Sequence, residues 1–249
     1  MSGHSKWATI KRKKAAVDAQ RGKMFTKIIR ELMTAARKGG GDPESNPRLR
    51  TAITAARGVN MPRENIDRAI KRGTGEIEGQ TFEEMSYEGY GPGGVALLID
   101  TLSDNKNRTV GEIRHILTKN HGSLGESGCV AWMFTLRGMI TVPAAARDEE
   151  GVMELVVESG AEDFSLAGDA YQIMTQPGDL FSVRDALEKR GVEITSAELA
   201  RIPQNTVTLT GKDAEAMIRL LEALEDNDDV QRVSANFDIA DELMESLGG

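Results

Sequence analysis

The clearest pattern of apolar and polar positions spans residues 23–38, with the sequence KMFTKIIRELMTAARK. At the 100° step of an α-helix, the apolar residues gather on one side and the cations on the other. The apolar side holds Met24, Phe25, Ile28, Ile29, Leu32, Ala35 and Ala36. The cationic side holds Lys23, Lys27, Arg30, Arg37 and Lys38. The pattern predicts an amphipathic helix that ends at glycines 39–41, because glycine adopts the positive φ of a helix C-cap at little cost.

Two shorter helical patterns follow, over 48–57 and 62–72. The first places Leu49, Ala52, Ile53 and Ala56 on one face, and the second Ile66, Ala69 and Ile70. Pro62 suits the first turn of the second helix, and Gly73 predicts its end. Three apolar stripes in one segment predict a small helical bundle. Its outward faces are expected to carry Arg48, Arg50, Arg57, Arg68, Lys71 and Arg72.

The rest of the chain alternates between strand and helix patterns. Strands are predicted over 84–90 and 95–102 around a glycine turn, then a helix over 107–120 and a strand over 129–134. A complete βαββαβ series follows, with strands at 139–142, 162–166, 170–175 and 192–199 and helices at 148–159 and 178–190. This order is typical of the ferredoxin-like unit.

The remaining patterns predict a strand over 206–210, a helix over 213–225 and a strand over 230–237. Joined to residues 95–134, they make a second βαββαβ series. The predicted fold class is therefore α+β: an N-terminal helical bundle followed by two ferredoxin-like domains, one inserted in the other. The predicted domains are 1–78, 79–134 with 204–249, and the inserted 135–203.

Charge divides the chain at the aperiodic stretch 73–80 (GTGEIEGQ). Residues 1–73 contain eighteen Lys and Arg against six Asp and Glu, a net charge of +12. The whole chain carries −8, so residues 74–249 carry −20. A basic segment on an acidic body points to a polyanionic partner.

The first twenty residues have only a thin apolar stripe, and the four consecutive cations 11–14 would surround a helix. We expect an arm that becomes ordered on phosphates. Trp7 either packs the arm onto the bundle, which is the commoner role of a lone tryptophan, or stacks on an unpaired base.

The basic segment is also compatible with a merely solvated helix face or with binding to anionic lipid. The opposite charge excess of the body argues against a merely solvated face. Binding to lipid is less favourable because the apolar side of the helix has neighbouring apolar stripes to pack against. The hypothesis is therefore nucleic-acid binding. The predicted contacts are Lys6, Trp7, Lys11, Arg12, Lys13, Lys14, Arg21, Lys23, Lys27, Arg30, Arg48 and Arg50. Lys106 and Arg108 form a weaker candidate, since Asp104 and Asn105 account for that segment as helix caps.

No constellation in the sequence indicates catalysis, a metal or a cofactor. Gly89–Gly94 fits G-x-G-x-x-G, but the following VALLIDTL favours a strand, so a turn between strands is expected. The three histidines and Cys129 lack metal-ligand spacing. Acidic pairs such as Asp226 and Asp229 are interpreted as cap and turn residues. A single cysteine, the lack of an apolar run long enough for a membrane span, and the lack of a signal peptide predict a cytoplasmic protein.

Four segments closely resemble the YebC/PmpR family: GHSKWATIKRKKAAVDAQRGKMFTKIIREL, NPRLRTAI, NMPRENIDRAIKRG and YEGYGPGGVALLIDTLSDNKNRT. The resemblance covers essentially the whole chain. It implies a helical N-terminal domain, two α+β domains and nucleic-acid binding. The family includes bacterial proteins described as transcriptional regulators and a mitochondrial translational activator of cytochrome oxidase subunit I.

The sequence thus predicts a non-enzymatic DNA-binding transcriptional regulator. The alternative from the resemblance is a translation factor on RNA, including the ribosome. A third hypothesis is a scaffold whose basic segment docks on an acidic protein surface, or on its own body. The oligomeric state is left open.

Overall fold

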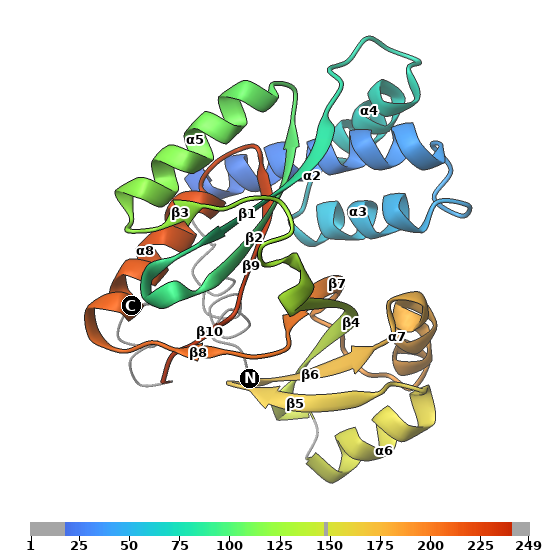
Figure 1. The fold of residues 1–249 in the computed structure, drawn as a ribbon. Helices are drawn as coiled ribbons and strands as arrows, with labels where there is room; N and C mark the ends of the chain where they lie inside the picture. Colours follow the sequence, from blue (N-terminus) through green and yellow to red (C-terminus); the bar gives the residue numbers. More distant parts are fainter. Residues whose placement is uncertain (1–17, 147–148, 241–249) are drawn as a thin grey trace. The chain divides into compact units, whose positions relative to one another are not determined.

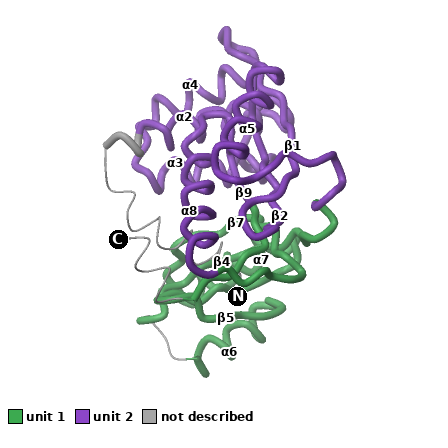
Figure 2. Tube along the Cα trace, turned by 60° about the vertical axis from the view of Figure 1, so that its left-hand side comes forward, with its two compact units in different colours: residues 1–12, 131–209, 234–249 green, residues 13–130, 210–233 purple. Residues whose placement is uncertain are grey.

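The structure, a computed structural model, describes residues 18–146 and 149–240. Within this part of the chain, two compact units are present (Figure 2). One comprises residues 18–130 and 210–233, and the other residues 131–146, 149–209 and 234–240. The first unit contains the N-terminal helices and a sheet, and the second contains the inserted βαββαβ series.

The N-terminal helices are α2 (Asp18–Gly39), α3 (Pro47–Gly58) and α4 (Arg63–Thr74). Helix α2 packs against both α3 and α4 (Figure 1). Their shared core confirms the three predicted stripes. It contains Leu32, Met33, Ala35, Ala36, Leu49, Ala52, Ala56, Met61, Ile66 and Ala69. Asn46 caps α3 by accepting a hydrogen bond from the Leu49 amide at 3.0 Å.

Gly73 does not end its helix as predicted, because α4 runs on to Thr74 and Gly75 forms the left-handed cap at φ 85°. Gly73 instead faces α2. A Cβ at this position would overlap the carbonyl oxygen of Met33 and lie 2.8 Å from the Cβ of Ala36. The glycine is therefore required by close packing of α2 on α4.

The first sheet has the order β3-β1-β2-β9. Its strands are β1 (Glu83–Tyr90), β2 (Ala96–Ser103), β3 (Ser123–Leu124) and β9 (Val230–Ala235). Strand β1 runs antiparallel to both β2 and β3. Helices α5 (Lys106–Lys119) and α8 (Gly211–Glu225) pack against each other beside this sheet (Figure 1). The short helical turn η1 (Pro92–Gly94) joins β1 to β2, which confirms the predicted glycine turn.

The second four-stranded sheet has the order β5-β6-β4-β7. Its elements confirm the inserted βαββαβ series, although β4 begins five residues earlier than predicted and β7 is displaced by four residues toward the C-terminus. They are β4 (Phe134–Pro143), η3 (Ala144–Ala146), α6 (Glu149–Ser159), β5 (Asp163–Ala167), β6 (Ala170–Thr175), η4 (Pro177–Asp179), α7 (Leu180–Lys189) and β7 (Ser196–Pro203). Ile140, Ile173, Val152 and Leu187 belong to one core between this sheet and its two helices.

Two predicted strands differ from the structure. Residues 129–134 form no strand before Phe134; Ala131–Met133 is the short helical turn η2. The buried carboxylate of Glu88 accepts the amides of Gly128 at 2.6 Å and Val130 at 2.7 Å, so it replaces ladder partners there. The strand predicted over 206–210 is only β8 (Val207–Thr208), parallel to β10 (Phe237–Asp238) in a separate sheet.

The α+β fold class, with N-terminal helices followed by sheet domains, is confirmed. The three-domain boundaries given above stay a prediction.

Candidate nucleic-acid interface

Half of the predicted nucleic-acid contacts lie outside the described residues: Lys6, Trp7, Lys11, Arg12, Lys13 and Lys14. Arg21 belongs to α2, but its side chain is also outside the description. The other five are Lys23, Lys27 and Arg30 on α2 and Arg48 and Arg50 on α3.

Arg30 lies against the acidic loop that follows α8. Its Nη1 donates to the Asp229 carboxylate at 2.5 Å, to the Asp228 carbonyl at 2.7 Å and to the Leu102 carbonyl at 3.2 Å. Its guanidinium also lies over the Phe82 ring, 5.1 Å from the centroid. Only 15% of the Arg30 side chain is exposed. Arg30 therefore connects the α2 helix to the first sheet.

Asp229 is the centre of this contact, with 4% of its side chain exposed. Besides Arg30, it accepts hydrogen bonds from Arg108 of α5 at 2.8 Å and from the Thr109 hydroxyl at 2.6 Å. Burial alone would raise the pKa of the Asp229 carboxyl. The hydrogen bonds from Thr109, Arg108 and Arg30 outweigh it, so the pKa is lowered. Asp229 is thus an ionised acceptor in the interior, rather than the turn residue that the sequence suggested.

The other cations along this side of α2 have partners at the end of α8 and in the loop that follows it. Lys23 forms an ion pair with Asp226 at 3.1 Å, and the Lys27 ammonium donates to the Glu225 carbonyl at 2.5 Å. Lys23, Lys27 and Arg30 follow the i, i+4, i+7 spacing of one helical stripe. One stripe of α2 is therefore complementary to residues 225–229.

Arg48 is held between two carboxylates. It makes a bidentate contact to Glu31, with Nε at 2.6 Å and Nη2 at 2.9 Å, and it also pairs with Glu84 of β1. The hydrogen bond to Glu31 is the main cause that raises the pKa of the Arg48 guanidinium. Burial raises the pKa of Glu84, but the contacts with Lys38 and Arg48 have a larger, opposite effect, so the pKa is lowered. Arg50 lies half-buried on α3.

A second set of cations in the bundle faces solvent. Arg57 is in the last turn of α3, and Arg68, Lys71 and Arg72 lie on α4; all four are exposed. Among the residues that the structure describes, none of these four forms an ion pair. Arg63, which the prediction did not include, is 93% exposed and lies 3.7 Å from Asp67.

Cations at the C-terminal end of a helix also stabilise the helix dipole, by about 0.3–1 kcal/mol each. This accounts for part of the presence of Arg57, Lys71 and Arg72. It does not account for Arg68, which lies in the middle of α4 and on the same side as Arg72. Arg68, Lys71 and Arg72 together make a cationic face that we call the α4 face.

The weaker candidate at Lys106 and Arg108 is explained by capping and ion pairs. The side chain of Asn105 caps α5 by accepting the Arg108 amide at 3.1 Å. Arg108 pairs with Asp104 and Asp229, and Lys106 pairs with Glu83 at 3.1 Å. The hydrogen bond to Asp229 is the main cause that raises the pKa of Arg108.

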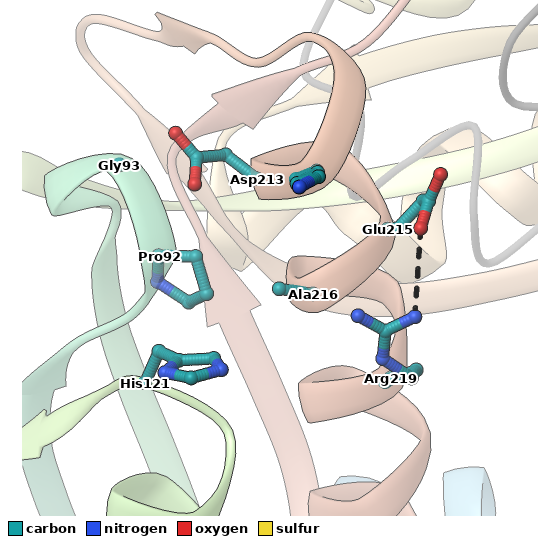
Figure 3. Close-up of a pocket in the computed structure, with 8 residues that line it drawn as sticks. Pro92, Gly93, His121, Asp213, Glu215, Ala216 and Arg219 are labelled. Atoms are coloured by element: carbon teal, nitrogen blue, oxygen red, sulfur yellow. Dashed lines mark ion pairs between the residues drawn. The ribbon is translucent and has the colours of Figure 1, made fainter.

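A shallow groove lies beside the glycine turn (Figure 3). Pro92 and His121 form one side and face Ala216 and Arg219 of α8 on the other. Lys212 and the carboxylates of Asp213 and Glu215 also line it, and Arg219 lies 3.7 Å from Glu215. The groove therefore carries both signs of charge and favours neither an anion nor a cation.

The chain's single cysteine, Cys129, is half-buried and is a thiol rather than one half of a disulfide. In the described part of the chain, no group of three or more His, Cys, Asp or Glu side chains is arranged to hold a metal ion. No described helix has the length and apolar composition that a membrane span requires.

Fold and charge define the class: an α+β protein in which a helical N-terminal segment with exposed cations precedes two mixed α/β sheet regions. The family model for the TACO1/YebC protein N-terminal domain matches residues 5–76. The model for the TACO1/YebC second and third domain matches residues 82–237. The chain belongs to the TACO1/YebC family, as the four sequence segments predicted.

Relatives match along their whole length. A protein of Pelotomaculum thermopropionicum is 60% identical over 97% of this chain and 100% of its own. One of Desulfatibacillum aliphaticivorans is 57% identical over 98% of this chain and 99% of its own. Both bear the name "probable transcriptional regulatory protein". The crystal structure of a conserved hypothetical protein of Aquifex aeolicus has 51% identity and a TM-score of 0.85, over 92% of this chain and 95% of that one.

Proposed function

We propose that the chain is a non-enzymatic regulator of transcription that binds DNA through its basic N-terminal domain, residues 1–78. The names of the relatives support the regulatory role. The net charge of +12 over residues 1–73 supports a polyanionic ligand. The observation that carries the proposal is the division of the bundle's cations into two sets, one paired internally and one exposed.

The internally paired set has a structural role in this proposal. Lys23, Lys27, Arg30 and Arg48 already hold acidic or carbonyl partners. Releasing Arg30 to a phosphate would leave the buried Asp229 without one of its donors, which is costly in the protein interior. We therefore assign the phosphate contacts to the α4 face, Arg57 and the arm cations Lys6 and Lys11 to Lys14.

The salt dependence of binding tests this assignment. Duplex DNA binding that engages about six phosphates gives a slope of log K against log salt near −5. Replacing Arg68 and Lys71 by Ala removes two contacts and is expected to make that slope about 2 less steep. Fluorescence anisotropy of a labelled duplex, titrated at several KCl concentrations, measures it.

The matched control is Lys189→Ala with Arg190→Ala, which removes the same charge at the end of α7. This variant is expected to leave the slope unchanged. Equal slopes for both double variants would show that the α4 face makes no local contact. A wild-type chain that binds no nucleic acid at physiological salt would overturn the proposed function.

The same titrations with a structured RNA test the alternative of a translation factor. Tighter binding to that RNA than to the duplex at equal salt would replace DNA by RNA as the target.

A further inference from the structure

Helix α5 carries a net positive charge, whereas the body of the protein around it is acidic. Residues 74–249 contain thirteen Lys and Arg against thirty-three Asp and Glu. Between Asn105 and His121, however, there are four Lys and Arg, one acidic residue and two of the chain's three histidines. The overall acidity of the body does not account for a local reversal of this kind.

The ion pairs of α5 lie beside its buried face at Lys106 and along one edge of its outward face at Arg108 and Glu112. Lys106, Arg108 and the single acid, Glu112, have partners: Glu83, Asp229 and the Asn227 amide, respectively. Thr109, Ile113 and Leu117 are buried against the rest of the unit. These contacts account for the inner face of the helix and for the edge where Arg108 and Glu112 lie.

The outward face of α5 is exposed, and the one carboxylate at its edge, Glu112, is already bound to Arg108 and Asn227. At 100° per residue it holds Asn107, Gly111, Arg114, His115, Thr118 and Lys119, all exposed. In the part of the chain that the structure describes, Arg114 and Lys119 form no ion pair. Every side chain on this face except that of glycine has a group that can donate a hydrogen bond.

Gly111 is the second observation that points to a ligand. A glycine inside a helix is less favourable than alanine, because its backbone loses more conformational freedom. A Cβ at Gly111 would meet nothing within 4 Å, so packing does not require the glycine. This differs from Gly73, where a Cβ would overlap α2. A missing side chain between cations lets an extended polymer approach the helix backbone closely.

We infer that the outward face of α5 is a second contact for the sugar–phosphate backbone of the nucleic acid. The inference rests on the proposed function and extends it to the body of the protein. Arg114 and Lys119 pair with phosphates, Asn107, His115 and Thr118 donate hydrogen bonds, and Gly111 gives the room for the approach. The α5 face and the α4 face belong to the same compact unit.

The charge test uses the full chain with Arg114→Ala and Lys119→Ala together. Salt titrations with duplex DNA and with an RNA hairpin are expected to give a slope about 2 less steep than wild type on the polymer that is bound. The control is again Lys189→Ala with Arg190→Ala. A slope equal to that of this control on both polymers overturns the inference.

The steric test uses Gly111. Gly111→Ala is expected to raise the Tm by about 2 °C, because alanine favours the helix. Gly111→Gln adds a long neutral side chain at an exposed site and is expected to weaken binding severalfold while the fold stays intact. Unchanged affinity of Gly111→Gln, in a variant whose Tm is at least that of wild type, overturns the close approach.

The two proposals fail in distinguishable ways. If the α4 variant flattens the slope and the α5 variant does not, the proposed function stands and the second contact is lost. If wild type binds neither polymer, the proposed function fails first.

Discussion

Helices α2 and α4 both present cations opposite an apolar stripe, yet the structure uses the two faces differently. The stripe of Lys23, Lys27 and Arg30 on α2 meets residues 225–229, with Asp229 buried at its centre. The α4 face meets no internal acid among the described residues, and its three cations are exposed. A cationic helix face therefore indicates a polyanionic ligand only where the folded protein places no acidic group of its own against that face.

The most severe test of the comparison is Asp229→Ala. It leaves Arg30 and Arg108 without their buried acceptor, and breaking a buried pair in this way costs about 3–5 kcal/mol. Urea unfolding at neutral pH measures the loss. Asp228→Ala is the matched control and is expected to stay within about 0.5 kcal/mol, because that side chain is exposed. A loss below about 1 kcal/mol for Asp229→Ala would mean that the α2 cations are not structural.

The next largest effect is expected for Gly73→Ala. The new Cβ would overlap the carbonyl oxygen of Met33, so α4 must move away from α2, at a cost of about 1–3 kcal/mol. Gly58→Ala serves as the control, because a Cβ there meets nothing within 4 Å. The urea concentrations at the unfolding midpoints of the two variants measure the difference, and equal midpoints would contradict the close packing of α4 on α2.

A smaller, pH-dependent effect is expected for Asp229→Asn, which keeps the volume of the side chain. The Asp229 pKa is lowered in the folded protein, so its contribution to stability is complete above the unfolded value of about 3.9. That contribution is lost as the pH falls from there through the folded pKa. The difference in unfolding free energy between wild type and variant should be constant from neutral pH to about 5 and shrink below about 4. A constant difference down to the acid limit would argue against an ionised Asp229.

The smallest effects separate the two faces directly. Lys23 and Asp226 are 45% and 63% exposed, so Lys23→Ala is expected to change stability by no more than about 0.5 kcal/mol. It should leave the salt slope of DNA binding unchanged. Arg68→Ala should also preserve stability but flatten the slope by about 0.9. A reversed result, with Lys23 changing the slope and Arg68 not, would exchange the roles of α2 and α4.

Local patterns predicted most of the elements because helix and strand periods are local properties. The stripes at Leu32, Ala52 and Ile66 all entered one core, as expected. The strand predicted over 129–134 was wrong. The apolar residues of this segment do not reveal that Glu88, about forty residues earlier, accepts hydrogen bonds from the amides of Gly128 and Val130. Likewise, nothing near Gly73 in the sequence identifies Met33 as its neighbour.

The two sheets show the same limit at the level of topology. In the inserted series the second, third, first and fourth strands lie in that order, as β5-β6-β4-β7. By analogy the outer series would place the predicted strands 129–134 and 206–210 before β2 and β9, but β3 and β1 occupy those two places. Strand β1 extends over eight residues and pairs along its full length with β2, whereas β8 has two residues. The longer strand forms more ladder hydrogen bonds, which is consistent with its place in the sheet.

The sequence by itself determined the N-terminal helical bundle, the order of the α+β elements, the segregation of charge and the family. These follow from periodicity, composition and motifs, which are properties of neighbouring residues. Only the tertiary structure decided which cations are already neutralised, because Asp226 and Asp229 approach α2 across some two hundred residues of chain. Electrostatic pairing depends on distance in space and on burial, and neither can be read from spacing along the chain.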